Sequence, residues 1–179
     1  MSRQFWGELL AWATASGTAV ANSTTETILF PNITIPANYL QDGRTIRIKA
    51  WGQISNVVTS QPTMTFRLRW GGVAGTVLAA SAALTASATA FTNAIWEIEI
   101  MLTVRSNGSS GTVMTIGSVC AGNLATVAPN YMGSAGATSP AAVTVDLTAD
   151  TALSLTAQWS AANASNSIQG INYSIEAMN

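Results

Sequence analysis

Two pairs of acidic residues are the arrangement in this sequence that is most suited to chemistry. Glu97 and Glu99 are two positions apart in an alternating segment, so they share one strand face at a separation of about 7 Å. Glycosidases use two carboxylates that flank the scissile bond. On an open sheet face beside arginines, however, such carboxylates are more often solvated charges. Asp146 and Asp150 lack the dense oxygen ligands and the glycine turn of a calcium loop, so we interpret them as a strand end.

The other reactive residue types are almost absent. The sequence has no histidine, which excludes imidazole acid–base chemistry and histidine-ligated metals. The single cysteine, Cys120, permits no intrachain disulfide, and its alternating context predicts a small buried hydrophobic residue. No phosphate-binding loop, dinucleotide-binding motif, nucleophile elbow or Cys-x-x-Cys motif is present. We therefore expect a non-enzymatic protein with no cofactor and no metal site.

The composition limits the partners. The 179 residues suffice for one domain, and 48% of them are hydrophobic, which argues against disorder. Seven Lys and Arg residues disfavour binding of nucleic acid through its phosphates, and the apolar stretches are too short to cross a membrane. Only 8% of residues are charged, against a usual share of about 25%. A surface with so little charge is poorly protected against association, so we expect partners to cover part of it.

Residues 1–22 differ from the rest of the chain. Their apolar residues recur at helix-like spacing, and a helix of two or three turns is marginal by itself. We predict an N-terminal arm over residues 1–22, with a short helix as one option, packed against a partner. Ala19–Ala21 fits a signal-cleavage pattern, but Glu8 interrupts the apolar region that a signal peptide needs. The arm residues expected to contact a partner or a neighbouring subunit are Phe5, Trp6, Leu9, Leu10 and Trp12.

From residue 23 onward, apolar and polar residues alternate almost everywhere. This period of two, with turn signals between the segments, predicts an all-β, single-domain antiparallel β-sandwich or jelly roll over residues 23–179. We expect about eight principal strands and two long surface loops, at 85–94 and 123–140. The expected strands are 26–35, 45–54, 63–70, 73–79, 96–104, 112–120, 152–159 and 168–176, with a short addition at 143–147.

These strands would carry two groups of side chains with alternative interpretations. Arg47, Lys49, Arg67 and Arg69 form either a basic patch or solvated strand faces paired with Glu97 and Glu99, and the second is favoured because the carboxylates are available. Tryptophans in the strands offer either a platform for stacking sugars or, as is usual in alternating runs, core and interface residues. Those tryptophans are Trp51, Trp70, Trp96 and Trp159.

A resemblance to a known family rests on the strand segments and their turns. The segments are ITIPANYLQDGRTIRIKAWG, TFRLRWGGVAGT, AIWEIEIMLTVRSNGSSGTVMTIG, the closing LTADTALSLTAQWS and a tyrosine-bearing last strand. Over about residues 25–177 the chain resembles the jelly-roll capsid decoration, or cement, proteins of tailed bacteriophages. The resemblance implies a homotrimer that binds the major capsid protein across capsomer boundaries, with no nucleic-acid or membrane partner. It also implies synthesis in the host cytoplasm and a final location on the outer capsid surface of the virion.

Other functions remain open at this point. A trimeric receptor-binding or tail-fibre head domain would recognise host surface glycans through loops such as 123–140. A carbohydrate-binding module of a secreted enzyme, or a major capsid protein built from one jelly roll, are weaker alternatives. Binding to capsids, as opposed to host cells, separates the first two functions. Deletion of residues 1–22 is expected to leave a folded β domain with weakened attachment.

Overall fold

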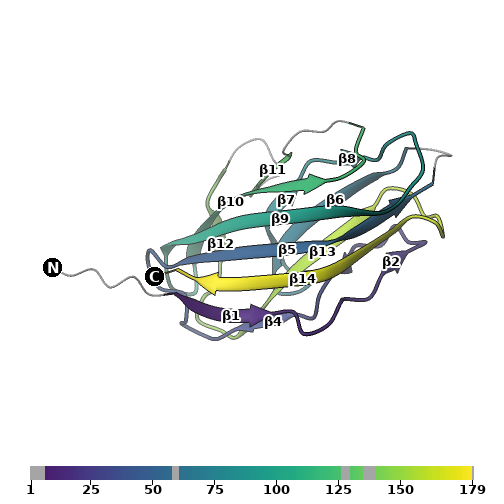
Figure 1. The fold of residues 1–179 in the computed structure, drawn as a ribbon. Helices are drawn as coiled ribbons and strands as arrows, with labels where there is room; N and C mark the ends of the chain where they lie inside the picture. The colour runs from purple at the N-terminus through teal and green to yellow at the C-terminus, as the bar shows by residue number, and fades with distance from the viewer. Residues whose placement is uncertain (1–6, 58–60, 126–129, 135–139, 179) are drawn as a thin grey trace.

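The computed structural model describes residues 7–57, 61–125, 130–134 and 140–178, and within them the chain forms strands and no helix (Figure 1). The longest strands coincide with the segments of alternating apolar and polar residues. The strands are β1 (Glu8–Trp12), β2 (Val20–Ala21), β3 (Thr27–Ile28), β4 (Ile33–Ile35), β5 (Thr45–Asn56), β6 (Thr63–Trp70), β7 (Thr76–Ser81), β8 (Leu84–Thr85), β9 (Phe91–Ser106), β10 (Gly111–Ala121), β11 (Asn130–Gly133), β12 (Val143–Val145), β13 (Thr151–Trp159) and β14 (Ser167–Ala177).

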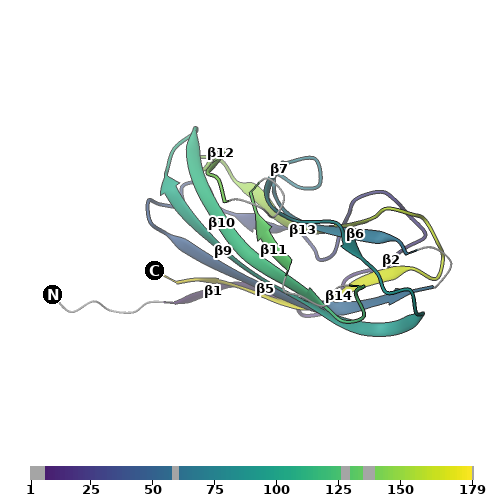
Figure 2. The same ribbon diagram turned by 90° about the horizontal axis from the view of Figure 1, so that it is seen from above.

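All strands belong to one antiparallel sheet that curls into two layers (Figures 1 and 2). The hydrogen-bonded order is β1-β14-β5-β9-β10-β11-β7-β6-β13-β3, and β12, β2, β4 and β8 pair with β10, β14, β13 and β6. We call β1, β14, β5, β9 and β10 the first layer, and β7, β6, β13, β3 and β4 the second layer. Strand β11 joins the two layers by pairing with β10 and β7. The predicted all-β antiparallel sandwich is confirmed.

The core lies between the layers and is built by the alternation along each strand. In β5 every second residue from Ile46 to Asn56 is buried, and its neighbours are half-buried on the other side. Phe66 of β6 and Trp96 of β9 meet across the core, with ring centroids 5.2 Å apart. Complete burial of such side chains stabilises the fold by about 2–3 kcal/mol each. The inward faces predicted from the sequence for β5 and β6 are therefore correct.

The predicted strands and turns are largely present. Each of the eight predicted segments contains a strand, although 26–35 is divided into β3 and β4. Turn signals between the predicted segments include Asp42-Gly43, Gly71-Gly72 and Asn107-Gly108, and the glycines there have positive φ, a conformation that glycine adopts without a steric penalty. The loop predictions were too long, because β9 already begins at Phe91 and β11 lies within 123–140. Residues 126–129 and 135–139 of the second loop are outside the described residues.

The short helix expected as one option for the N-terminal arm is not formed within residues 7–22. Residues Glu8–Trp12 form β1, which pairs with β14, and β2 pairs with the other end of β14. The edge of β14 offers a row of free backbone donors and acceptors, and pairing with it satisfies the arm's own backbone, which outweighs a marginal helical tendency. A bulge between Leu9 and Ala11 turns Leu10 and Ala11 toward the core. The division of the chain at residue 22 stays a prediction.

Candidate functional site

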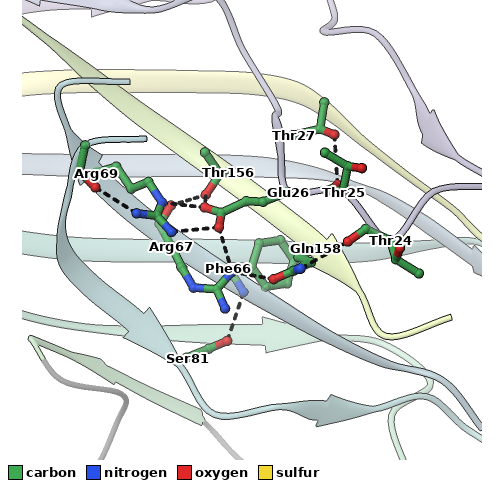
Figure 3. Close-up of polar contacts among 11 residues, drawn as sticks. Thr24, Thr25, Glu26, Thr27, Phe66, Arg67, Arg69, Ser81, Thr156 and Gln158 are labelled. Carbon is green, nitrogen blue, oxygen red and sulfur yellow. Dashed lines mark hydrogen bonds and ion pairs between the residues drawn. The ribbon is translucent and has the colours of Figure 1, made fainter. Parts of the chain in front are cut away.

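The most connected polar cluster surrounds Glu26, just before β3 (Figure 3). Its carboxylate accepts hydrogen bonds from Arg67 Nη1 at 3.0 Å, from Arg69 Nε and Nη2 at 2.5 and 2.7 Å, and from Thr156 Oγ1 at 2.5 Å. Arg67 also donates to Gln158, whose amide donates to the carbonyl of Thr24. The cluster therefore ties the segment before β3 across β13 to β6.

The partners of Glu26 determine its ionisation. Burial raises the pKa of Glu26, but the hydrogen bonds from Arg69 and Thr156 and the charges of Arg67 and Arg69 outweigh burial and hold the pKa below its ordinary value. Both carboxylate oxygens are occupied by donors, which leaves a poor proton acceptor for general-base chemistry. We interpret the cluster as structural. Sequence reasoning overlooked Glu26 because its partners are 41 and 43 residues away.

The four basic residues do not form one patch. Arg47 and Lys49 lie on β5 in the first layer, where Arg47 contacts Glu176 and the Lys49 ammonium is 3.6 Å from Glu99. Arg67 and Arg69 lie on β6 in the second layer and face away from the first, because both strands turn their apolar sides to the shared core. Pairing with Glu99 is confirmed for Lys49, whereas the arginines pair with Glu176 and Glu26.

The acidic pairs occupy surface positions. Glu97 and Glu99 are exposed on the outer side of β9. Asp146 accepts hydrogen bonds from the backbone and hydroxyl of Thr148, and Asp150 accepts one from the Ala37 amide at 2.8 Å. These contacts agree with the predicted strand end between β12 and β13.

The described residues carry neither a cluster suited to a metal ion nor a membrane-spanning helix. No group of three or more Cys, Asp and Glu side chains there is arranged to hold a metal ion. The same residues contain no helix of the length and apolarity needed to span a membrane.

The tryptophans do not form a common platform. Trp70, Trp96 and Trp159 are buried in the core, and only Trp51 of the four lies on the outer side of its strand. The prediction that Cys120 is a small buried residue is wrong, because its side chain is exposed. In β10 the neighbouring Val119 takes the buried position, so strand alternation turns Cys120 outward.

Figure 1 shows the strands of the first layer from the front. Their register places the outward side chains in rows across the strands. Directly paired residues in antiparallel strands project to the same side of the sheet. The register therefore defines four rows. They are Leu9, Glu176, Arg47, Met101 and Ile116; then Trp12, Ser174, Lys49, Glu99, Ser118 and Tyr131; then Asn172, Trp51, Glu97 and Cys120; and finally Gln169, Gln53 and Ile95.

All of the large apolar side chains that are exposed among the described residues belong to strands of the first layer or to β11, which pairs with β10 at its edge. They are Leu9, Trp12, Ile95, Ile116, Tyr131 and Ile171, with exposed fractions from 39% to 72%. The second layer has none among its described residues. Strand spacings of about 4.8 Å and row spacings of about 6.7 Å give the rows an extent of roughly 24 by 20 Å. An accumulation of exposed apolar side chains on one face is typical of an interaction surface.

The predicted contact residues are distributed over different environments. Leu9 and Trp12 lie at the edge of the outer face, with exposed fractions of 50% and 56%. Leu10 packs against the core instead, at the β1 bulge, where it and Ala11 both face inward. Phe5 and Trp6 are outside the described residues. The sequence analysis did not select Ile95, Ile116 or Tyr131. Their outward direction follows from strand alternation, and this signal could have identified them.

Comparisons with known proteins give structural similarity without a family. No family model and no curated protein matches the sequence. Among solved structures, the CBM2 module of the evolved Dit of Lactobacillus casei BL23 phage J-1 is similar with a TM-score of 0.42 and 11% identity over 99% of this chain and 98% of that chain. Peanut lectin bound to a 9mer peptide has a TM-score of 0.39 and 8% identity, with 98% of each chain covered. Similarity at this level carries no functional argument.

Proposed function

We propose that this chain is a non-enzymatic virion structural protein, a capsid decoration protein that binds the major capsid protein through the outer face of its first layer. The observation that carries the proposal is the accumulation of exposed apolar side chains on this one face. Burying them against a partner removes apolar surface from water, which is the main favourable term in protein association.

The charges on the face suit a protein partner. Arg47 contacts Glu176, and Lys49 lies 3.6 Å from Glu99, so these charges have partners before any contact is made. Aromatic residues are enriched in protein interfaces, and Trp12 and Tyr131 lie in one row of the face. The rows extend over roughly 480 Å², a little more than half of the roughly 800 Å² that each partner contributes to a standard interface.

The finer assignments belong to the same proposal. We infer a homotrimer on the outer surface of the capsid, made in the host cytoplasm, in which the arm adds contacts to those of the face. Several weak contacts per trimer would then combine through multivalency to give firm attachment. The alternative is a trimeric receptor-binding or tail-fibre head domain that recognises host glycans.

The position of Cys120 on the outer face provides a direct test. It is exposed and paired in register with Glu97, so a maleimide reagent should label it in the free protein. After co-sedimentation with expanded capsids that lack decoration protein, labelling should be at least tenfold slower. The matched control combines Cys120→Ser with Thr34→Cys, which places the thiol on the exposed side of β4 in the second layer. That thiol should react equally fast in free and capsid-bound protein.

Three results would contradict the proposal. Absence of saturable binding to capsids would exclude the decoration function. Equal protection of both thiols would show that the outer face is not the specific contact surface. A Cys120 thiol that is already protected in the free oligomer would show that copies of this chain, and not the capsid, cover the face.

A further inference from the structure

A groove of about 520 Å³ lies beside the arm, separate from the outer face except for Trp12 at their common border. One wall is formed by residues 12–18, from the last residue of β1 onward, and the other by residues 28–32, from the last residue of β3 to the start of β4. Tyr173 of β14 contributes between them. The groove therefore lies where the two ends of the curled sheet meet. Its volume is within the range of roughly 300–1,000 Å³ that is usual for small-molecule sites.

The walls of the groove are held in place by backbone contacts. The amides of Ala13 and Gly17 donate to the carbonyls of Tyr173 and Gly170 at 3.0 and 2.8 Å, and the Gln169 side chain donates to the Gly17 carbonyl at 2.8 Å. Gly17 approaches the opposite wall so closely that a Cβ there would be 1.9 Å from the Leu29 carbonyl oxygen. The groove is thus preformed, which lowers the entropic cost of binding a ligand.

The lining is uncharged and rich in hydroxyl groups. No Asp, Glu, Lys or Arg lines the groove, whereas Thr14, Ser16 and Thr18 on the arm are exposed and carry hydroxyl groups. Burial raises the pKa of Tyr173, so its hydroxyl stays protonated and can donate a hydrogen bond. No described residue forms a hydrogen bond with this hydroxyl. Asn32 uses its Oδ1 to accept from Ser154 at 2.6 Å, and its amide nitrogen remains as a donor.

The apolar part of the groove is aromatic. The rings of Phe30 and Tyr173 are 4.8 Å apart, and Trp12 at the border is 56% exposed. Tyr and Trp rings present an apolar surface beside a polar group, a combination that suits a ligand with both apolar and hydrated parts.

We propose that this groove binds a neutral saccharide. A sugar ring has a C–H face that packs on aromatic side chains and hydroxyl groups that exchange hydrogen bonds with the Tyr173 hydroxyl, the Asn32 amide and the arm hydroxyls. A charged ligand would lose hydration without gaining an opposite charge in the groove, which disfavours acidic sugars and ionic ligands. The site does not depend on attachment to a capsid, so the two proposals can fail separately.

The first experiment screens the full-length protein on an array of neutral oligosaccharides of glucose, galactose and N-acetylglucosamine, with sialylated and sulfated counterparts. We expect binding to at least one neutral oligosaccharide and weaker binding to its acidic counterpart. No binding to any neutral oligosaccharide, or a preference for the acidic ones, would overturn the proposal.

The second experiment titrates the bound oligosaccharide into variants. Trp12→Ala should weaken binding at least tenfold, and Tyr173→Phe, which keeps the ring beside Phe30, should weaken it about fivefold through loss of one hydrogen bond. The matched controls are Leu9→Ala on the same strand and Tyr131→Phe on the outer face, both at exposed positions. Thermal melting would verify that all four variants are folded. Equal affinities in the groove variants and the controls would place the sugar elsewhere and contradict the assignment.

Discussion

Arg69 holds the carboxylate of Glu26 with two parallel hydrogen bonds, from Nε to Oε1 at 2.5 Å and from Nη2 to Oε2 at 2.7 Å. Such two-pronged pairing fixes the orientation of both groups and is stronger than a single neutral hydrogen bond. The same arginine donates from Nη1 to the Gly75 carbonyl at 2.7 Å. One side chain of β6 therefore fastens both the segment before β3 and the turn that leads into β7.

Glu26→Gln should destabilise the fold by about 2–3 kcal/mol, because two largely buried arginines lose their counter-charge. Urea unfolding followed by tryptophan fluorescence would measure the loss. Glu97→Gln is the matched control, since Glu97 is exposed, and its free energy of unfolding should change by less than about 0.5 kcal/mol. Equal effects of the two substitutions would show that the Glu26 cluster does not stabilise the protein.

The same cluster predicts a loss of stability in acid. The pKa of Glu26 is lowered in the folded protein from its ordinary value of 4.5, so its contribution is complete above that value and is lost as the pH falls through the folded pKa. The melting temperature of the native protein should therefore decrease more steeply below pH 4.5 than that of Glu26→Gln. Parallel curves for the two proteins between pH 5 and 3 would contradict this assignment.

Gly170→Ala should destabilise the sandwich by about 1–3 kcal/mol, because the added Cβ would lie 2.3 Å from the Phe30 ring. Phe30 is buried and its ring lies 4.8 Å from that of Tyr173, so the ring must shift to accommodate the methyl group. Gly122→Ala provides the comparison, since its Cβ would meet neighbouring atoms at 3.4 Å or more. Differential scanning calorimetry should show a lower melting temperature for the first variant only, and a similar decrease in both would refute the packing argument.

Deletion of residues 1–22 should lower stability more than the sequence suggests. It removes β1 and β2 from the edge of β14 and takes Leu10, Ala11 and Val20 from the core. We expect a shorter deletion of residues 1–6 to keep the native melting temperature. The longer deletion should lower it by at least 5 °C and promote association through the exposed edge of β14. Light scattering and circular dichroism would compare the two, and equal melting temperatures would show that the arm is dispensable for the fold.

Individual residues show which sequence patterns predicted burial and secondary structure correctly. The alternation of Ile46, Ile48 and Ala50 identified the buried side of β5, because a strand repeats every two residues whatever its neighbours are. For Cys120 the same rule was applied in the wrong phase, because the adjacent Val119 takes the inward position and alternation then turns Cys120 outward. Helix-like spacing in the arm was misleading, because a short segment adopts the structure that its surroundings can pair.

The candidate site was less accessible to sequence reasoning than the fold. Trp12 and Leu9 were predicted to be contact residues from their type and position in the arm. Ile95, Ile116 and Tyr131 lie near them only because β1, β9, β10 and β11 belong to one sheet. Likewise, Tyr173 and Phe30 are far apart in the chain and meet only where the curled sheet closes.

The sequence by itself determined that the chain forms strands, where most of them lie and which side of each is buried, because these properties follow from local periodicity and turn residues. Tertiary structure decided which strands are neighbours, and with them the partners of Arg67 and Arg69, the outer face and the groove beside the arm. The physical reason is that strand pairing is non-local. Register and curl are selected by the combined burial of the whole core, and any edge strand presents the same backbone groups to every candidate partner.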